Sequence, residues 1–219
     1  MSPGESRRLV LLRHGRTAWN DSGRAQGHAD IGLDEVGHRQ AAAAAPALAA
    51  LRPSALWTSD LARARQTCAY VERATGLTAK VDERLREYDV GARQGMDTVQ
   101  FRESYPEAFE SWTRGDEEHL VPGAESTPDV LRRMVPALRE FLASLDAGET
   151  GIVVTHGASL KDAMFDLLGW SQQHMPSLRG MDNCAWAVLV EHLTLDRLRL
   201  ATYNQQVAGP DFASAKGVG

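Results

Sequence analysis

The stretch Leu9-Val10-Leu11-Leu12-Arg13-His14-Gly15 decides the fold, because an apolar run gives way abruptly to Arg-His-Gly. Such a run, bounded by charge and glycine, predicts a buried strand of the parallel type. A strand that leads into a glycine turn and a helix start can bind an anion through free backbone N–H groups. The later stretch Gly151-Ile152-Val153-Val154-Thr155-His156-Gly157 ends in the same way. We expect the two His-Gly turns to meet at one edge of the sheet.

The composition is that of an ordinary globular protein, with 219 residues, 43% hydrophobic and 24% charged. The net charge of −5, with both signs spread along the chain, gives no electrostatic case for nucleic acid or a membrane as partner. The first strand is too short to be a signal or membrane segment. Cys68 and Cys184 have no paired spacing, which favours free thiols in a reducing compartment. We therefore expect a cytoplasmic protein.

Alternating strands and helices predict an α/β fold that binds ligands at the carboxyl ends of its strands. Further strands are expected at 55–58, 77–81, 151–155, 184–191 and 197–203, and helices at 34–51, 61–75, 127–146 and 159–169. Asp34 is the expected N-cap of the first helix, and Ser59 or Asp60 that of the second. Prolines at 46 and 136 predict a kink or an early stop in two helices.

One domain is expected over residues 1–206, with a flexible tail at 207–219. Residues 92–126 are short of regular strand patterns and rich in aromatic and acidic residues, and we interpret them as a small helical insertion that covers the site. Aromatic residues at helical spacing in this segment are expected to form the insertion's own core.

Five residues with matching chemistry stand at strand ends or early in helices: Arg13, His14, Arg63, Glu87 and His156. Two arginines can grip a phosphoryl group in a bidentate way. One neutral imidazole can attack phosphorus, a second can donate to the phosphoryl oxygens, and a carboxylic acid can protonate the leaving oxygen. These groups suffice for phosphoryl transfer without a metal. We expect the two arginines to lower the pKa of His14, and a bound phosphate dianion to keep Glu87 protonated.

Each of these residues also has a simpler interpretation. A histidine at a strand end is usually a structural hydrogen-bonding group, and a helical arginine such as Arg63 is usually exposed. The other histidines show no metal-ligand spacing, although His28 shares a loop with Gln26 and stays open. The catalytic interpretation rests on all five residues recurring in a consistent strand order.

That order, and the motifs around it, resemble the histidine phosphatase superfamily, also called the phosphoglycerate mutase-like family, over about residues 8–204. The matching pieces are Leu12-Arg13-His14-Gly15-Arg16-Thr17 with Trp19-Asn20, Ser59-Asp60-Leu61 with Arg63-Ala64 and Thr67, Leu85-Arg86-Glu87 with Gly91, Pro122-Gly123 with Glu125-Ser126, and Thr155-His156-Gly157. The segment 180–186 looks like the actinobacterial branch, which includes glucosyl-3-phosphoglycerate phosphatase.

The resemblance implies the family's fold, a three-layer α/β/α sandwich with a mostly parallel sheet and one antiparallel strand, and a role for each matching residue. It implies that His14 is the phosphorylated nucleophile, that Arg13, Arg63 and His156 form the phosphate pocket, and that Glu87 is the proton donor. It further implies that a second group of residues borders the phosphate and the substrate: Thr17, Asn20 and Gln26. Family members use no metal, and we expect no cofactor.

Two departures from the family pattern bear on the substrate. Arg16 stands where Glu or Gln is usual, and Arg93 replaces a tryptophan in the Gly91–Gly95 motif. Two additional arginines near the mouth predict a substrate with a second anionic group, although Arg93 could equally be a surface replacement. Ala124 and Ala158 replace family glycines and remove no catalytic group.

The sequence therefore predicts a metal-independent phosphomonoester hydrolase that acts on a small-molecule phosphate ester of anionic or sugar type. A mutase that uses the same site is the first alternative, and a non-catalytic phospho-ligand-binding module is the second. A homodimer is compatible with an antiparallel strand near the C-terminus.

Overall fold

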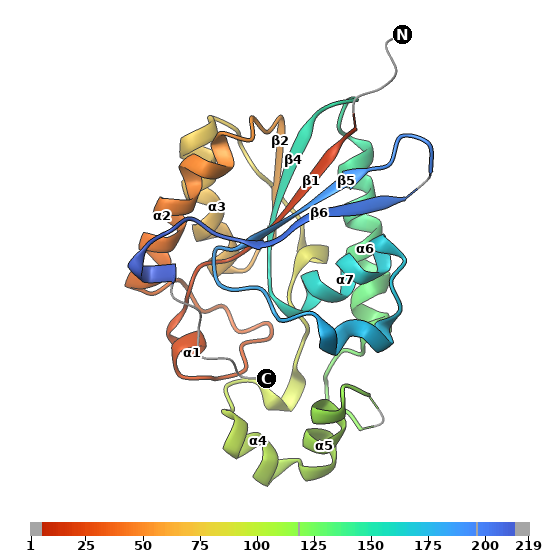
Figure 1. Cartoon of the computed structure of the whole chain (residues 1–219). Coiled ribbons are helices and arrows are strands. Elements are labelled where there is room, and N and C mark those ends of the chain that lie inside the picture. The colour runs from red at the N-terminus through yellow and green to blue at the C-terminus, as the bar shows by residue number, and fades with distance from the viewer. Residues whose placement is uncertain (1–5, 118, 196, 213–219) are drawn as a thin grey trace.

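The computed structural model describes residues 6–117, 119–195 and 197–212, and shows a mixed sheet with helices on both faces (Figure 1). Within these residues six strands form the order β3-β2-β4-β1-β5-β6. Strand β5 is antiparallel to both of its neighbours, and the other pairs are parallel. The predicted sandwich with one antiparallel strand is confirmed. The strands are β1 (Arg8–Arg13), β2 (Ala55–Thr58), β3 (Lys80–Val81), β4 (Thr150–Thr155), β5 (Trp186–Glu191) and β6 (Leu198–Gln205).

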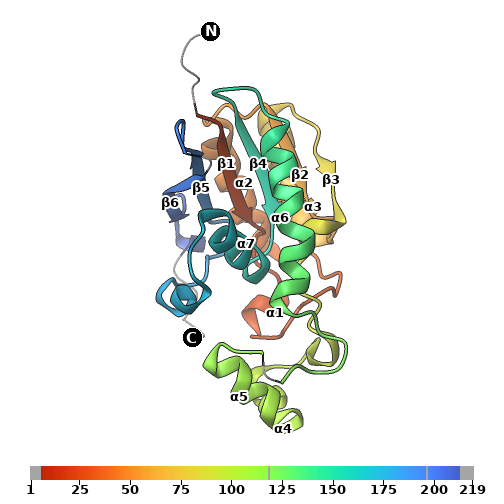
Figure 2. The same ribbon diagram turned by 90° about the vertical axis from the view of Figure 1, so that its right-hand side faces the viewer.

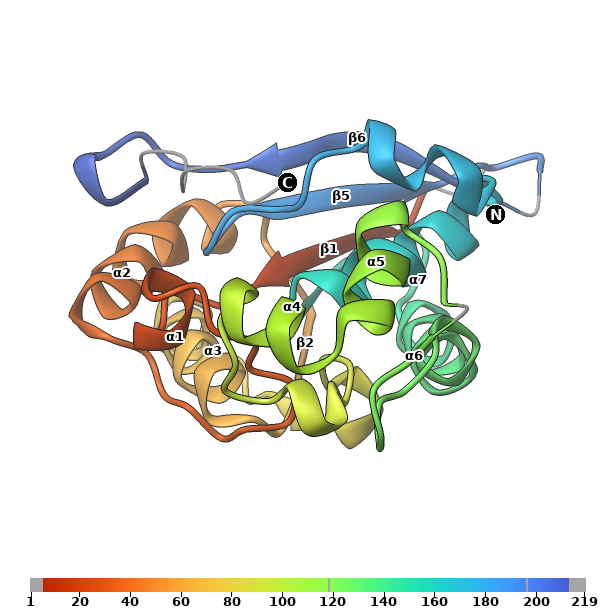
Figure 3. The same cartoon turned by 90° about the horizontal axis from the view of Figure 1, so that it is seen from below.

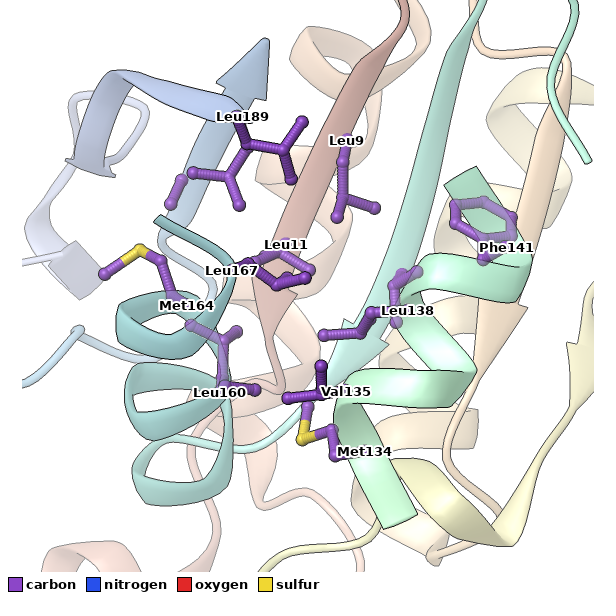
Figure 4. Packing of buried hydrophobic residues seen from close by; sticks show 14 of the residues in the cluster. Leu9, Leu11, Met134, Val135, Leu138, Phe141, Leu160, Met164, Leu167 and Leu189 are labelled. Atoms are coloured by element: carbon purple, nitrogen blue, oxygen red, sulfur yellow. The ribbon is translucent and has the colours of Figure 1, made fainter. Parts of the chain in front are cut away.

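Alternating side chains of β1 build the cores on both faces of the sheet. Leu9 and Leu11 pack in the cluster that includes α6 (Thr127–Ala143) and α7 (Ala158–Leu168), as Figure 4 shows. Val10 and Leu12 belong to the opposite cluster, with α2 (Glu35–Ala49) and α3 (Ala62–Thr75). Figure 2 shows α6 and α7 together on one side of the sheet. Burial on both faces explains why this strand is an uninterrupted apolar run.

The insertion lies beyond the carboxyl ends of the parallel strands (Figures 1 and 3). It has its own small core. It contains η2 (Gly91–Arg93), α4 (Thr98–Ser104) and α5 (Pro106–Arg114). Phe101 is 3% exposed, and its ring centroid lies 5.6 Å from that of Phe109 and 6.0 Å from that of Trp112. The prediction that these aromatic residues form the insertion's own core is confirmed.

The expected side-chain cap of α3 is wrong. The N-cap is Leu61, which has no capping side chain, and the amide of Ala62 instead donates to Asp30 Oδ1 at 2.6 Å. Ser59 is directed at His156, and Asp60 forms an ion pair with Arg86. The two predicted caps are thus engaged around the site, and a residue from a distant loop replaces them.

Other boundaries differ modestly from the prediction. Strand β3 is only Lys80–Val81, because the amide of Ala79 donates to Glu72 Oε1 at 2.8 Å instead of joining the sheet. Helices α2 and α6 continue past their internal prolines and end at Ala49 and Ala143.

The structure also departs from the expected flexible tail. Residues Pro210–Phe212 form the 3-10 helix η4, and Asp211 makes a bidentate pair with Arg39 of α2 at 2.9 and 3.0 Å. Phe212 packs against the core between α2 and the sheet. Residues 213–219 of the predicted tail lie outside the described residues. Two further 3-10 helices are η1 (Glu83–Leu85) and η3 (Gln172–Ser177).

Candidate active site

The two His-Gly turns meet at the carboxyl ends of neighbouring strands. Strands β1 and β4 pair in parallel with Arg13 opposite Thr155, so His14 and His156 follow at equivalent positions. Their ring centroids lie 5.2 Å apart, and the two side chains are 3% and 0% exposed. The expectation that both turns share one edge of the sheet is confirmed.

His14 is held as a neutral imidazole with one defined free nitrogen. Its Nδ1 lies 2.7 Å from the carbonyl oxygen of Gly15, which can only accept, so Nδ1 carries the proton and Nε2 carries the lone pair. Burial lowers the pKa of His14 well below its usual value, and the charges of Arg63 and Arg13 lower it further. The predicted direction is confirmed, although burial outweighs the arginines. A neutral, oriented Nε2 is the form that a nucleophile requires.

Two glycines let helix α2 approach the His14 turn closely. A Cβ on Gly37 would lie 2.0 Å from the carbonyl oxygen of Arg16, and one on Gly15 would lie 2.7 Å from that of Gly37. The Gly15 amide also donates to Thr67 Oγ1 on α3 at 3.0 Å. The turn that carries His14 is therefore fixed by backbone contacts with both helices on this face of the sheet.

Arg63 is 1% exposed and joins three parts of the site. Its Nε donates to His156 Nδ1 at 3.2 Å, and its two terminal nitrogens donate to the carbonyls of Ala29 and Gly27 at 2.8 Å. Burial lowers the pKa of Arg63 to about 10, so the side chain remains a cation at neutral pH. Since a guanidinium has five N–H groups, two remain for an anion in the pocket.

His156 has both ring nitrogens engaged by the protein. Because Nδ1 accepts from Arg63, the proton of the neutral ring is on Nε2, which lies 2.9 Å from Ser59 Oγ. Burial lowers the pKa of His156 well below its usual value, and Arg63 adds to this. In this arrangement His156 donates to Ser59, so a direct contact of His156 with a phosphoryl oxygen stays a prediction.

Arg13 has an unpaired donor beside the second turn. One terminal nitrogen donates to the carbonyl of Met181, whereas the buried Nε has no partner among the described residues. A Cβ on Gly157 would lie 3.1 Å from this Nε, so the glycine leaves room for the guanidinium. An orphaned buried donor next to two neutral histidines is suited to an anionic ligand.

Glu87 lies where the second turn becomes helix α7. Its carboxylate accepts from the amides of Ala158 and Ser159 at 3.0 and 2.8 Å, and from its neighbour Tyr88 at 3.0 Å. Helix α7 starts directly after His156-Gly157, so the carboxyl group lies beside the second His-Gly turn. The structure thus brings together all five residues of the predicted catalytic group.

Thr17 orients the two predicted amide side chains. It forms the N-terminal cap of α1 (Ala18–Asp21), and its hydroxyl lies 3.1 Å from Asn20 Oδ1 and 3.0 Å from Gln26 Oε1. Both amide oxygens therefore face Thr17, and neither amide nitrogen makes a hydrogen bond with another described residue. Thr17 is itself buried in this capping role. The amide nitrogens of Asn20 and Gln26 are the groups left to contact a ligand.

The two additional arginines have different surroundings. Arg16 lies between two carboxylates, with its Nε 2.8 Å from Asp34 and a terminal nitrogen 2.6 Å from Asp21. Arg93 lies between Phe101 and Trp112, with its guanidinium carbon 4.3 and 4.4 Å from the ring centroids, and has no carboxylate partner among the described residues. Burial lowers the pKa of Arg93 to about 10. Of the two, only Arg93 keeps an uncompensated charge.

Some contacts around the site could not be predicted from the sequence. The Asn183 side chain and the Cys184 amide both donate to the carbonyl of His14, at 3.0 and 3.2 Å. Arg133 and His28 each donate to the carbonyl of Glu87 at 2.8 Å. Such contacts with backbone carbonyls join segments far apart in the sequence, and a motif search cannot find them.

Within the described residues, no three His, Cys, Asp or Glu side chains gather as a metal site would require. No helix in this part of the chain has the length and apolar character needed to span a membrane.

The profile of the histidine phosphatase superfamily (branch 1) matches residues 9–206. The chain belongs to this superfamily. It is 38% identical over 194 residues to glucosyl-3-phosphoglycerate phosphatase of Mycobacterium tuberculosis, covering 85% of this chain and 86% of that one. It is 35% identical over 181 residues, and 81% of each chain, to a probable phosphoglycerate mutase of Yersinia enterocolitica.

Among solved structures, the chain resembles mycobacterial glucosyl-3-phosphoglycerate phosphatase in complex with VO3, with a TM-score of 0.83 and 37% identity. The match covers 90% of this chain and 98% of that one. The superfamily resemblance on which the predicted residue roles rest is therefore confirmed for nearly the whole chain.

Proposed function

We propose that this protein is a metal-independent phosphomonoester hydrolase that forms a phosphohistidine at His14. The observation that carries the proposal is the state of His14: a buried neutral imidazole whose Nε2 has no hydrogen bond to any described residue, beside two cationic guanidinium groups. Membership in the histidine phosphatase superfamily supports the same chemistry. The substrate is a small-molecule phosphate ester.

In the first half-reaction, His14 Nε2 attacks the phosphorus, so that an N–P bond forms as the P–O bond to the alcohol breaks. Arg13 and Arg63 stabilise the charge on the phosphoryl oxygens, and the amide nitrogens of Asn20 and Gln26 donate to the same group. Glu87 gives a proton to the leaving oxygen. The alcohol then departs neutral.

In the second half-reaction, water attacks the phosphohistidine. The ionised Glu87 takes a proton from this water, the N–P bond breaks, and its electron pair returns to His14 Nε2. Inorganic phosphate leaves, and both residues regain their starting protonation states. Neither half-reaction needs an electron carrier or a metal ion.

The proposed substrate has an anionic or sugar-type leaving group. The M. tuberculosis relative named for glucosyl-3-phosphoglycerate supports a leaving group with both features. Arg93 is the residue of this chain that supports a second anionic group, since its charge has no carboxylate partner in the described residues. The carboxylates around Arg16 make that residue a weaker candidate than the sequence suggested.

The first experiment measures phosphate release from a panel of metabolite phosphates with EDTA present, using the wild type and His14→Ala. We expect release by the wild type alone, ranked by leaving group. Wild-type activity that EDTA abolishes, or full activity of His14→Ala, would contradict the proposal.

A mutase is the second candidate, because the Yersinia relative is named a probable phosphoglycerate mutase. An isomerisation assay primed with a bisphosphate separates it from a hydrolase. A purely binding module would bind phosphate esters without any turnover.

We further propose a cytoplasmic location, since Cys68 and Cys184 are both buried free thiols. We also propose a homodimer, for which the sheet edge at β6 offers a surface. Sedimentation of the purified protein tests the assembly.

A further inference from the structure

A single arginine of α6 binds the backbone that carries Glu87. Arg133 Nε and one terminal nitrogen bind the two carboxylate oxygens of Glu125 at 2.9 and 2.8 Å. The other terminal nitrogen donates to the carbonyls of Arg84 and Arg86 at 2.9 and 2.8 Å, and a further bond reaches the carbonyl of Glu87 at 2.8 Å. All five N–H groups of the guanidinium are thus engaged.

These contacts hold the backbone of Glu87 in place. Three carbonyls within residues 84–87 converge on one rigid, planar group, and His28 binds the Glu87 carbonyl from the opposite loop at 2.8 Å. The side chain of Glu87 then bridges to the amides that begin α7. Glu87 is therefore held both at its backbone carbonyl and at its carboxylate oxygens.

Arg133 also joins this backbone to the end of the insertion. Glu125 Oε2 accepts from the amide of Asp89 at 2.9 Å, and the Glu125 amide donates to the carbonyl of Asp89 at 2.9 Å. The carboxylate of Glu125 compensates the positive charge of Arg133. With no free N–H group, Arg133 is not available as a phosphate ligand, which separates its role from those of Arg13 and Arg63.

We propose that Arg133 is a positioning residue for the proton-transfer step, holding Glu87 where its carboxyl group reaches the leaving oxygen. The inference rests on the proposed hydrolase function. Proton transfer needs heavy atoms within about 2.6–3.2 Å, so a small displacement of the Glu87 backbone lowers its rate. Attack by His14 does not depend on this displacement.

The test compares two leaving groups by their kcat/KM values, which report the steps up to release of the alcohol and exclude later hydrolysis of the phosphohistidine. One substrate is p-nitrophenyl phosphate, whose phenolate leaves without a proton. The other is an alkyl ester, such as glycerol phosphate, whose alkoxide needs one. The variant is Arg133→Lys, since lysine has three N–H groups in place of five and cannot span the same acceptors.

We expect Arg133→Lys to lower kcat/KM for the alkyl ester by about 10–100-fold and for the aryl ester by less than about 3-fold. The matched control is Arg132→Lys on the same helix, because that exposed side chain pairs with Asp129 alone among the described residues and should change neither value. In a Glu87→Gln background, Arg133→Lys should add no further loss for either ester. Equal losses for both esters, or a full additional loss in that background, would overturn the positioning role.

Two further measurements keep the result unambiguous. If Arg133→Lys does not fold, Glu125→Gln is used instead, because it weakens the hydrogen bonds of the same guanidinium to a smaller extent. It should also lower kcat/KM more for the alkyl ester than for the aryl ester, by a smaller factor. A wild type that releases phosphate from neither ester nor the metabolite panel would refute the proposed function itself. An active wild type with equal losses in the variant would refute only the inference about Arg133.

Discussion

The phosphate pocket and the insertion use arginine in opposite ways. In the pocket, Arg63 is 1% exposed and is bound to His156 and to two backbone carbonyls. In the insertion, Arg93 is held only between Phe101 and Trp112 in the described residues. One arginine is fixed by directional hydrogen bonds, whereas the other is held by ring faces that impose little direction.

This difference indicates that the two regions have separate roles in binding a substrate. A phosphoryl group is the same in every ester, so the groups that bind it can be fixed in advance. The leaving group varies between substrates, and the insertion, which we propose faces it, has a separate small core of Phe101, Ala108 and Val121. Changes in the side chains that bind the phosphoryl group should therefore affect all substrates alike, and changes in the insertion should alter their ranking.

The largest expected effect comes from Arg63→Lys. Lysine cannot reach His156 and both loop carbonyls at once, so we expect kcat/KM to fall by about 10²–10³-fold for every phosphate ester, with their ranking unchanged. Arg65→Lys, an exposed position on the same helix, is the matched control. A loss confined to some substrates would remove the distinction between pocket and insertion.

Gly37→Ala should be next in size, because it displaces the turn that carries His14. Its Cβ would lie 2.0 Å from the Arg16 carbonyl oxygen, and helix and turn must separate. We expect the free energy of unfolding to fall by about 2–3 kcal/mol or more, together with most of the activity toward all substrates. Gly180→Ala, with no atom within 4 Å of its Cβ, should change neither. Urea titration and the phosphate-release assay measure both effects.

Much of the pocket was predictable because its chemical groups directly follow strands with clear signals. The apolar run before Arg13 and the one before His156 predict two buried strands, and neighbouring parallel strands bring their ends together. The contacts of Arg133 were not predictable, since its partners are carbonyls 46–49 residues away that any residue type could supply. Whether the charge of an arginine near the site is compensated could not be predicted from the sequence either, because Arg16 proved to be paired with Asp21 and Asp34.

Arg93→Trp restores the residue usual in the family and tests the role of the insertion. A flat indole can lie between Phe101 and Trp112 as the guanidinium does, so we expect the fold to be kept. We expect kcat/KM to fall about 10-fold for substrates with a second anionic group and to change little for neutral ones. Arg102→Gln, an exposed site on α4, is the control. Unchanged selectivity would show that Arg93 has a structural role only.

Where α7 meets the insertion, a chain of hydrogen bonds contains one proton too few. Asp162 Oδ2 lies 2.8 Å from the hydroxyl of Tyr88, which lies 2.9 Å from that of Thr127, which in turn lies 2.6 Å from Glu117 Oε1. The two hydroxyls supply two protons for three hydrogen bonds, so all three can form together only when one of the end carboxyl groups, here Asp162, is protonated. Burial raises the pKa of Asp162 to about 6, and the charge of Glu87 also raises it, against the lowering effects of Tyr88 and Lys161.

Asp162→Asn should therefore have the smallest effect, on stability rather than on catalysis. Because the folded-state pKa of Asp162 lies above the unfolded value of about 3.9, the native state binds more protons, and stability falls as the pH rises from about 4 through about 6. An amide donates to Tyr88 at any pH. We expect the variant to exceed the wild type by about 1–2 kcal/mol at pH 8 and by almost nothing near pH 4. Urea unfolding at both pH values measures this, with Asp166→Asn, exposed one turn further along α7, as the control. A difference in unfolding free energy between variant and wild type that is the same at both pH values would contradict a raised pKa of Asp162 in the folded protein.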